Sequence, residues 1–282
     1  MPEIEQKAPA TSSAEKYKRR GFLLGAAGIG LAVWYGWPMV QRVLPQRFDF
    51  VWLDNPSGFR KLTIGNVSGA GNALAGIDRE RDPALDNMIA KARAQLCTSL
   101  YGPDDPAAGV VPIVSFSDYN CVYCRVVTEI LSEMQDDPSS GTRIVWREWP
   151  MLGPESVVQA KAALAAGNQD AYMAFHHTLM GSRFVPNIDY LANLATDKGL
   201  SARKLLADMN SPPVLSHIQE SRALASIFGF RGTPSMIVGR TAVSGNISRG
   251  KLEALIERER QEGPILALSL IHISEPTIRA II

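Results

Sequence analysis

The residues most able to do chemistry are two cysteines separated by two residues, Cys121 and Cys124. They directly follow an apolar, β-branched run at 110–117 that predicts a strand, and apolar residues then recur at helical spacing over about 121–134. Cys121 is therefore expected at a helix N-terminus, where unpaired N–H groups and the helix dipole favour a thiolate. Cys124 is expected to be more buried and able to close a disulfide. This spacing predicts a redox site.

Other uses of this pair remain open at this point. A CxxC pair can be half of a zinc site, but zinc takes about four ligands and Cys97 is the only other cysteine. The four histidines have no usable ligand spacing. A structural disulfide is the other alternative, although so short a loop constrains the unfolded chain little. We expect no metal and no cofactor.

Three further residues are assigned no role. His176 and His177 are expected at the core edge and on the surface of a helix. Cys97 ends a predicted helix over 83–96. It is either buried and inert, or available for a second bridge or for dimerisation.

A second signal lies far downstream, where Gly232-Thr233-Pro234 precedes an apolar run at 236–238. By itself this pattern indicates a turn before a strand. The chain between the two signals predicts several helices. Their expected ranges are 156–166, 169–180, 188–198, 201–209 and 214–228.

Three strings in order resemble segments of the DsbA-like branch of the thioredoxin superfamily: 116–124, 147–153 and 231–234. The resemblance covers about 109–262. It implies an α/β thioredoxin fold with a helical domain inserted at about 154–229. It also places further strands at 143–149, 236–238 and 242–244, and a closing helix at 248–260.

The resemblance also implies roles for individual residues. It implies two catalytic cysteines, two residues that tune the site and two that bind an extended substrate: Cys121, Cys124, Val122, Tyr123, Thr233 and Pro234. Pro234 would follow a cis peptide bond. Many members carry proline where this chain has Val122, and Ser115 stands where well-known members hold a buried acid. Proton handling by a carboxylate at that position is therefore not expected.

The implied activity is that of a thiol:disulfide oxidoreductase which donates a disulfide to unfolded or reduced exported proteins. Such an enzyme needs a membrane redox partner for reoxidation. A reductase or isomerase using the same CxxC motif, and a tethered binding or chaperone module, remain as alternatives. A kappa-class glutathione transferase would carry serine at the position of Cys121. The net charge of +1 argues against a nucleic-acid partner.

The N-terminal sequence predicts a membrane anchor. Basic residues at 16–20 precede an uncharged apolar run at 21–40, which is long enough to cross a bilayer as a helix of about 20 residues. The positive-inside rule places 1–20 in the cytoplasm and the redox domain on the periplasmic face of the cytoplasmic membrane. We expect an uncleaved, single-pass signal anchor. Residues 19–23 (RRGFL) also resemble a twin-arginine signal, so the export route stays open.

Two segments complete the expected organisation. Residues 41–108 are a linker or accessory segment. Short strands are expected at 48–53 and 59–64, and the rest of 41–81 is expected to be an extended spacer or a small accessory hairpin. Residues 263–282 form a tail. Within it, 268–277 (LSLIHISEPT) is the in-frame translation of a transposase end used in sequencing libraries, so we interpret this stretch as an assembly artefact.

Amplification of the gene from source DNA is expected to give different codons from position 268 onward. An uninterrupted codon run for 268–277 in that product would contradict the artefact interpretation.

Overall fold

The computed structural model describes residues 47–69, 82–104 and 107–263. In these residues six strands form one mixed sheet, in the order β1-β2-β6-β5-β3-β4. The strands are β1 (Val51–Trp52), β2 (Arg60–Thr63), β3 (Val111–Ser117), β4 (Thr142–Glu148), β5 (Ser235–Val238) and β6 (Thr241–Ser244). β3 runs parallel to β4, β5 is antiparallel to β3 and β6, and β2 runs parallel to β6.

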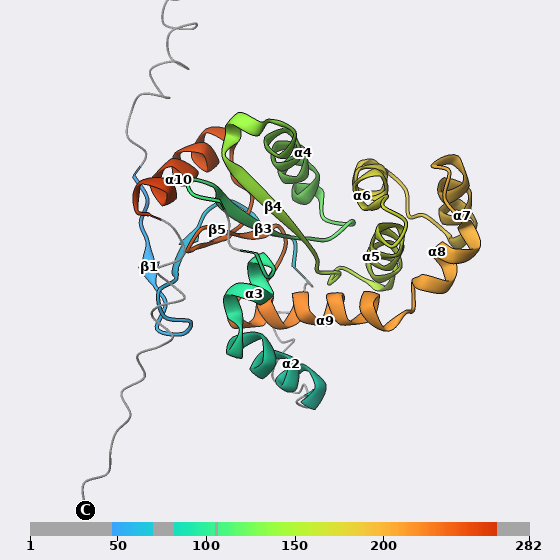
Figure 1. Cartoon of the computed structure of the whole chain (residues 1–282), viewed down its shortest axis with the longest axis horizontal. Coiled ribbons are helices and arrows are strands. Elements are labelled where there is room, and N and C mark those ends of the chain that lie inside the picture. The colour runs from blue at the N-terminus through green and yellow to red at the C-terminus, as the bar shows by residue number, and fades with distance from the viewer. Residues whose placement is uncertain (1–46, 70–81, 105–106, 264–282) are drawn as a thin grey trace, which may run out of the picture. The chain divides into compact units, whose positions relative to one another are not determined.

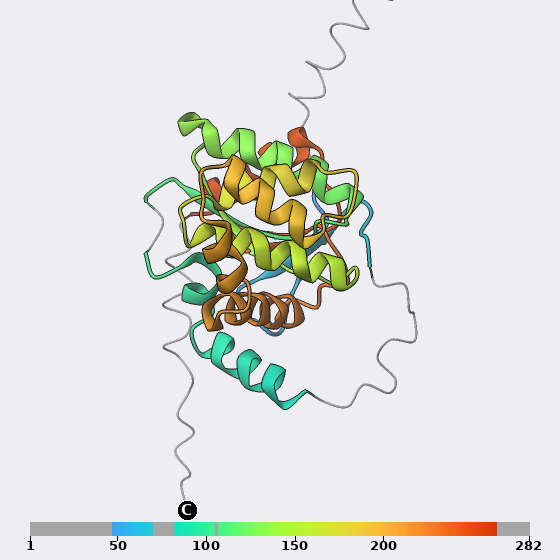
Figure 2. The ribbon, with the colours of Figure 1, turned by 90° about the vertical axis from the view of Figure 1, so that its right-hand side faces the viewer.

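Helices cover both faces of this sheet and form a further layer at one end (Figure 1). Around the sheet lie α2 (Pro83–Ala94), α3 (Leu96–Tyr101), α4 (Val122–Asp136), α9 (Pro212–Ile227) and α10 (Arg249–Gln261), with a 3-10 turn at Pro138–Ser140. The end layer contains α5 (Pro154–Gly167), α6 (Tyr172–Gly181), α7 (Ile188–Asp197) and α8 (Ala202–Asp208). Figure 2 looks onto this helical layer.

The alternation of side chains along β3 divides the core into two halves. Ile113 packs in one cluster with Leu131 of α4 and Leu255 of α10. Val114, on the opposite face, packs with Leu224 of α9. Each face of β3 is therefore covered by its own helices, which is why the strand is buried along its whole length.

A third cluster joins the helical layer to the start of α4. Ala163 of α5, Leu179 of α6 and Leu205 of α8 belong to it, and all three are fully buried. Cys121 and Cys124 belong to the same cluster. The cysteines therefore lie where the helical layer meets the N-terminus of α4.

The predicted α/β fold with a thioredoxin-like core is confirmed, and each expected core strand and helix is present within a few residues of its predicted range. The two short strands expected at 48–53 and 59–64 are present as β1 and β2, which form a hairpin, and β2 joins the main sheet through β6. The position predicted for Cys97 was wrong. The backbone breaks at Gln95, and Cys97 lies half-buried inside a separate helix, α3.

The predicted anchor at 21–40 and the stretch at 268–277 lie outside the described residues. Among the helices that the structure describes, none is both long and apolar enough to cross a membrane.

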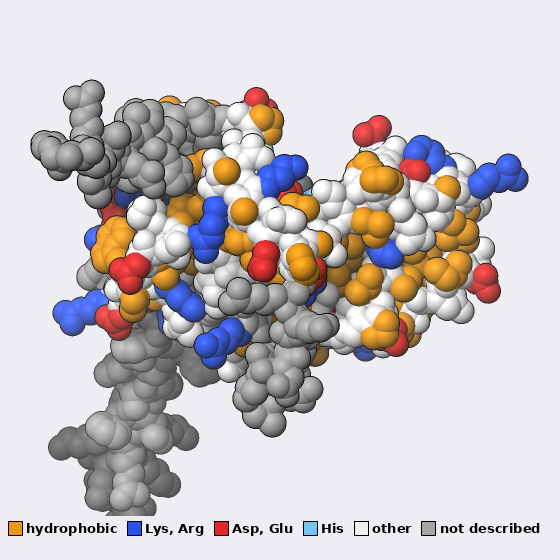
Figure 3. All heavy atoms as spheres, turned by 90° about the horizontal axis from the view of Figure 1, so that it is seen from below, with side chains coloured by type: hydrophobic (Ala, Val, Ile, Leu, Met, Phe, Trp, Pro, Cys, Tyr) orange, Lys and Arg blue, Asp and Glu red, His pale blue; other side chains and the backbone are white. Residues whose placement is uncertain are grey.

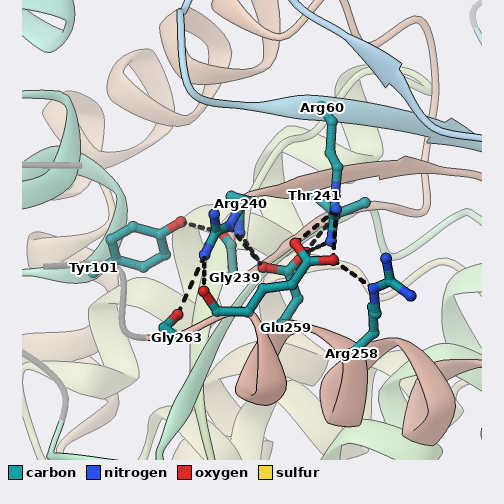
Figure 4. A network of polar contacts seen from close by, with 9 residues as sticks. Arg60, Tyr101, Gly239, Arg240, Thr241, Arg258, Glu259 and Gly263 are labelled. Carbon is teal, nitrogen blue, oxygen red and sulfur yellow. Dashed lines mark hydrogen bonds and ion pairs between the residues drawn. The ribbon is translucent and has the colours of Figure 1, made fainter. Parts of the chain in front are cut away.

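A buried ion pair ties β2 to the rest of the sheet (Figure 4). Arg60 of β2 and Glu259 of α10 are both almost fully buried, and Nη2 lies 2.6 Å from Oε1. Thr241 of β6 accepts from Arg60 Nε at 2.7 Å and donates to Glu259 Oε1 at 2.5 Å. The Arg240 backbone N–H donates to Glu259 Oε2 at 2.9 Å. These bonds supply the partners that a buried charge requires.

Arg60→Met should lower the free energy of unfolding by about 3 kcal/mol, because the buried Glu259 carboxylate keeps only the longer ion pair with Arg240 Nε, at 3.5 Å. Urea unfolding measures the loss. Arg249→Met is the matched control, since Arg249 pairs with Glu133 at the surface, and it should change the free energy by about 1 kcal/mol or less. Equal losses in the two variants would contradict this account.

Candidate redox site

Cys121 is the N-cap of α4, as its place in the sequence predicted. Its backbone is extended, with φ −85° and ψ 113°, and the helix begins at Val122. The backbone N–H of Cys124 donates to the Cys121 sulfur, with 3.2 Å between N and Sγ. The sulfur thus occupies the position that a Ser or Asp side chain takes in an ordinary N-cap, where unpaired N–H groups favour negative charge.

Thr233 and Pro234 lie directly beside this cap. The Thr233–Pro234 peptide bond is cis, as the family resemblance implied. The Cys121 thiol donates to the Thr233 carbonyl oxygen, with Sγ and O 3.3 Å apart. Pairing of β5 with β3, in which Ser235 lies opposite Phe116, brings the two sequence signals together.

The surroundings give the two thiols opposite pKa shifts. The pKa of Cys121 falls from 9.0 to about 6, first because the Cys124 thiol hydrogen-bonds its sulfur. Burial opposes the fall, while the polar side chains of Thr233 and Ser68 and the backbone N–H of Cys124 add to it. Burial is the main cause that raises the pKa of Cys124 well above 9.0. At neutral pH the pair therefore holds one thiolate, on Cys121, and one thiol.

Both cysteines are fully buried, with Cys121 0 % and Cys124 1 % exposed. The expected deeper burial of Cys124 agrees with the pKa shifts, because burial is the largest effect at Cys124 and not at Cys121. Sequence reasoning missed a segment beside this site. Ser68 forms an antiparallel bridge with Thr233, and its side chain is among the groups that lower the pKa of Cys121. No local sequence pattern connects Ser68 with the CxxC motif.

The two residues between the cysteines differ in exposure. Val122 is 67 % exposed at the start of α4, and Tyr123 is partly buried against the cluster of the helical layer. Val122 therefore presents an apolar surface next to the cysteines, while Tyr123 contacts the helical layer.

Asp118 holds the loop between β3 and α4 in place. Its buried carboxylate accepts from the backbone N–H of Asn120 at 2.8 Å and from the Ser156 hydroxyl at 2.6 Å. It also accepts from the backbone N–H groups of Met151 at 2.7 Å and Leu152 at 2.9 Å. Sequence reasoning missed this role, although an Asp that bonds the backbone N–H two residues later is a common turn signal.

Glu148 of β4 provides a second buried carboxylate. Ser115, which stands where well-known family members hold an acid, is also buried. Glu148 Oε1 accepts from the hydroxyls of Tyr119 at 2.7 Å and Tyr172 at 2.6 Å, and lies 3.2 Å from His176 Nδ1. The expected core-edge position of His176 was wrong, because its ring contacts Trp146 and Glu148 of β4 and is completely buried. His177 is exposed, as expected.

Within the described residues no group of three or more His, Cys, Asp and Glu side chains has an arrangement that would hold a metal ion.

Comparison with known proteins places this fold in a family. A family model described as DSBA-like thioredoxin domain matches residues 112–257. The chain belongs to this family. A thioredoxin-like oxidoreductase from Silicibacter pomeroyi DSS-3 is 38% identical and superposes with a TM-score of 0.53. The match covers 58% of this chain and 97% of that protein. The thiol-disulfide exchange protein alpha-DsbA2 from Wolbachia pipientis shares the fold at 20% identity, with a TM-score of 0.52, covering 64% and 99%.

Part of the chain is also similar to a protein that is named as an antiporter. The Na(+)/H(+) antiporter NhaA of Herminiimonas arsenicoxydans is 24% identical over 191 residues, which are 68% of this chain. The match spans 29% of the antiporter's length.

The ultraviolet absorbance of the Cys121 thiolate should titrate with a midpoint near pH 6, measured as reduced wild-type protein minus Cys121→Ser. Because the folded pKa lies below the unfolded value, ionisation of Cys121 stabilises the reduced protein. This stabilisation is complete above pH 9 and is lost as the pH falls through about 6. A midpoint near 9 would show that the hydrogen bonds do not stabilise the thiolate.

Proposed function

We propose that this protein is a thiol:disulfide oxidoreductase that donates the Cys121–Cys124 disulfide to unfolded or reduced exported proteins. The observation that carries the proposal is the position of the Cys121 sulfur at the N-terminus of α4, where it accepts the backbone N–H of Cys124 at 3.2 Å. A stabilised thiolate is a good leaving group and favours the reduced enzyme, so the oxidised enzyme tends to give its disulfide away.

The proposed reaction proceeds by two exchanges. A substrate thiolate attacks the Cys121 sulfur of the oxidised enzyme, and the bond to Cys124 breaks. The Cys124 sulfur leaves with the electron pair and takes up a proton, in accordance with its raised pKa. A second substrate thiolate then attacks the substrate sulfur of the mixed disulfide and releases the Cys121 thiolate. The substrate has lost two electrons and the enzyme has gained them.

Thr233 and Pro234 are proposed to position the substrate. The backbone N–H and carbonyl of Thr233 form an antiparallel bridge with Ser68 beside the redox cysteines. An extended peptide recognised by strand addition uses the same two groups. Exposed Val122 would contribute apolar contact beside the cysteines, and Tyr123 would support the motif from the helical layer.

Location and partners follow from the sequence. The proposed organisation is a cytoplasmic tail at 1–20, a single transmembrane anchor at 21–40, a segment at 41–108 and a redox domain at 109–262 on the periplasmic face. A membrane redox partner would remove the two electrons and reform the disulfide. Lys and Arg are interspersed with Asp and Glu on the face shown in Figure 3.

A reductase or isomerase using the same cysteines is the second candidate. It is favoured by the pKa of Cys121, because about 6 lies closer to the value of about 7 for thioredoxin than to about 3.5 for DsbA. The two directions differ in reduction potential rather than in the residues involved.

The reduction potential of the full-length protein, equilibrated with glutathione, should lie closer to about −120 mV, as in DsbA, than to about −270 mV, as in thioredoxin. The Cys121–Cys124 disulfide is quantified by mass spectrometry. A potential near about −270 mV would assign the protein to the reductases.

Paired variants test the chemistry itself. Cys124→Ser should accumulate a mixed disulfide with a reduced substrate protein in the presence of oxidised glutathione. Cys121 can still form this disulfide, but the enzyme has no second cysteine at position 124 to break it. Cys121→Ser should form none at this site. If the protein with both cysteines replaced by serine retained its full effect on substrate proteins, the binding or chaperone alternative would replace this proposal.

A further inference from the structure

The backbone edge of Thr233 is already occupied by another part of the chain, residues 64–69, which follow β2. The Ser68 N–H donates to the Thr233 carbonyl oxygen at 2.7 Å, and the Thr233 N–H donates to the Ser68 carbonyl oxygen at 2.9 Å. This reciprocal pair is the pattern by which an extended peptide is added to a strand edge in antiparallel orientation. The 64–69 segment therefore takes the position of an added peptide.

The bridge places Ser68 opposite Thr233, whose carbonyl oxygen lies 3.3 Å from the Cys121 sulfur. The Ser68 side chain is one of the polar groups that lower the pKa of this buried cysteine. Serine differs from cysteine only in carrying oxygen in place of sulfur. A cysteine at this position in a bound peptide would thus present its sulfur to Cys121, as formation of a mixed disulfide requires.

Several contacts hold the segment in this place. A Cβ on Gly232 would lie 2.5 Å from the Ser68 carbonyl oxygen and 3.0 Å from the Val67 Cβ, so the close approach depends on glycine there. The Asn66 N–H donates to Asn246 Oδ1 at 2.7 Å, and the Asn246 N–H donates to the Asn66 carbonyl oxygen at 3.1 Å. The segment is therefore bonded to the loops beside it at both Asn66 and Ser68.

We propose that the 64–69 segment is an internal occupant of the substrate-peptide position, in which Ser68 marks the place of the substrate cysteine. The inference rests on the proposed function, since it assigns the binding register of that same site. The partner it fits is an extended, cysteine-containing peptide that pairs antiparallel to Thr233. Such a peptide must displace Ser68 before it reaches Cys121.

The first test replaces Ser68 with cysteine, the residue that a bound substrate is proposed to place at this position. Ser68→Cys in a Cys124→Ser background is treated with oxidised glutathione. Cys121 first forms a mixed disulfide with glutathione, and the thiolate introduced at position 68 then displaces glutathione from it. Two protein thiols are oxidised, and one oxidised glutathione becomes two reduced molecules. The expected product is a disulfide between the introduced thiol and Cys121, identified by peptide mass mapping.

Val67→Cys in the same background is the matched control. Its neighbouring side chain points to the other side of an extended segment, so it should cross-link to Cys121 far less. Equal cross-linking from 67 and 68, or none from 68, would overturn the proposed register.

A second pair of variants separates coverage of Cys121 from thiolate stabilisation. Ser68→Pro removes the N–H that bonds Thr233, so alkylation of Cys121 by iodoacetamide at high pH should accelerate roughly fivefold, as expected for the loss of one hydrogen bond. Ser68→Ala keeps the backbone bridge and removes only the hydroxyl. It should leave the high-pH rate unchanged and move the midpoint of the pH profile upward. An unchanged alkylation rate in Ser68→Pro would overturn the proposal that the 64–69 segment must be displaced to expose Cys121.

The two proposals fail in different ways. Alkylation does not require exchange activity, so it reports on the segment even if the protein is not an oxidoreductase. If wild-type protein exchanges with glutathione but Ser68→Cys forms no cross-link, the function stands and the internal occupant is rejected. If wild-type Cys121 does not exchange with glutathione at all, the proposed function is rejected.

Discussion

The antiparallel pairing of β5 with β3 is the constraint on which the rest of this site depends. β3 ends just before the CxxC motif and β5 begins just after the cis Thr233–Pro234 bond. Pairing of Phe116 with Ser235 therefore sets the distance between the Thr233 carbonyl and the Cys121 sulfur. Asp118 then fixes the short loop that carries Cys121 to the start of α4. The redox geometry is thus a property of the sheet as much as of the motif.

Charge is stabilised at Cys121 although the residue is buried. Desolvation alone would raise its pKa, as it does for Cys124. The Cys121 sulfur accepts the backbone N–H of Cys124 and lies among polar groups that lower its pKa, and these effects outweigh the cost of burial. At Cys124 burial is the largest effect, and the contact with Cys121 raises the pKa further. Because Ser68 belongs to the segment that covers the site, its displacement would change both access to Cys121 and the stability of its thiolate.

The buried Arg60–Glu259 pair explains why the chain before β3 belongs to this architecture. It fixes β2 against β6 and α10 (Figure 4), and residues 64–69 continue from the end of β2. The segment that reaches Thr233 therefore starts from an anchored strand. A hairpin that at first resembles an accessory structure thus contributes directly to the environment of the redox cysteine.

The sequence by itself determined the features that depend on near neighbours. The β-branched run, the CxxC spacing and the helical periodicity after Cys121 predicted the strand, the N-cap and α4, because their patterns repeat within a few residues. Only the tertiary structure decided the burial of Cys121, the place of Ser68, the Glu148–His176 contact and the Arg60–Glu259 pair. These contacts join residues far apart in the chain, so they leave no local pattern. Their formation depends on which strand edges and helix faces meet once the whole sheet has assembled.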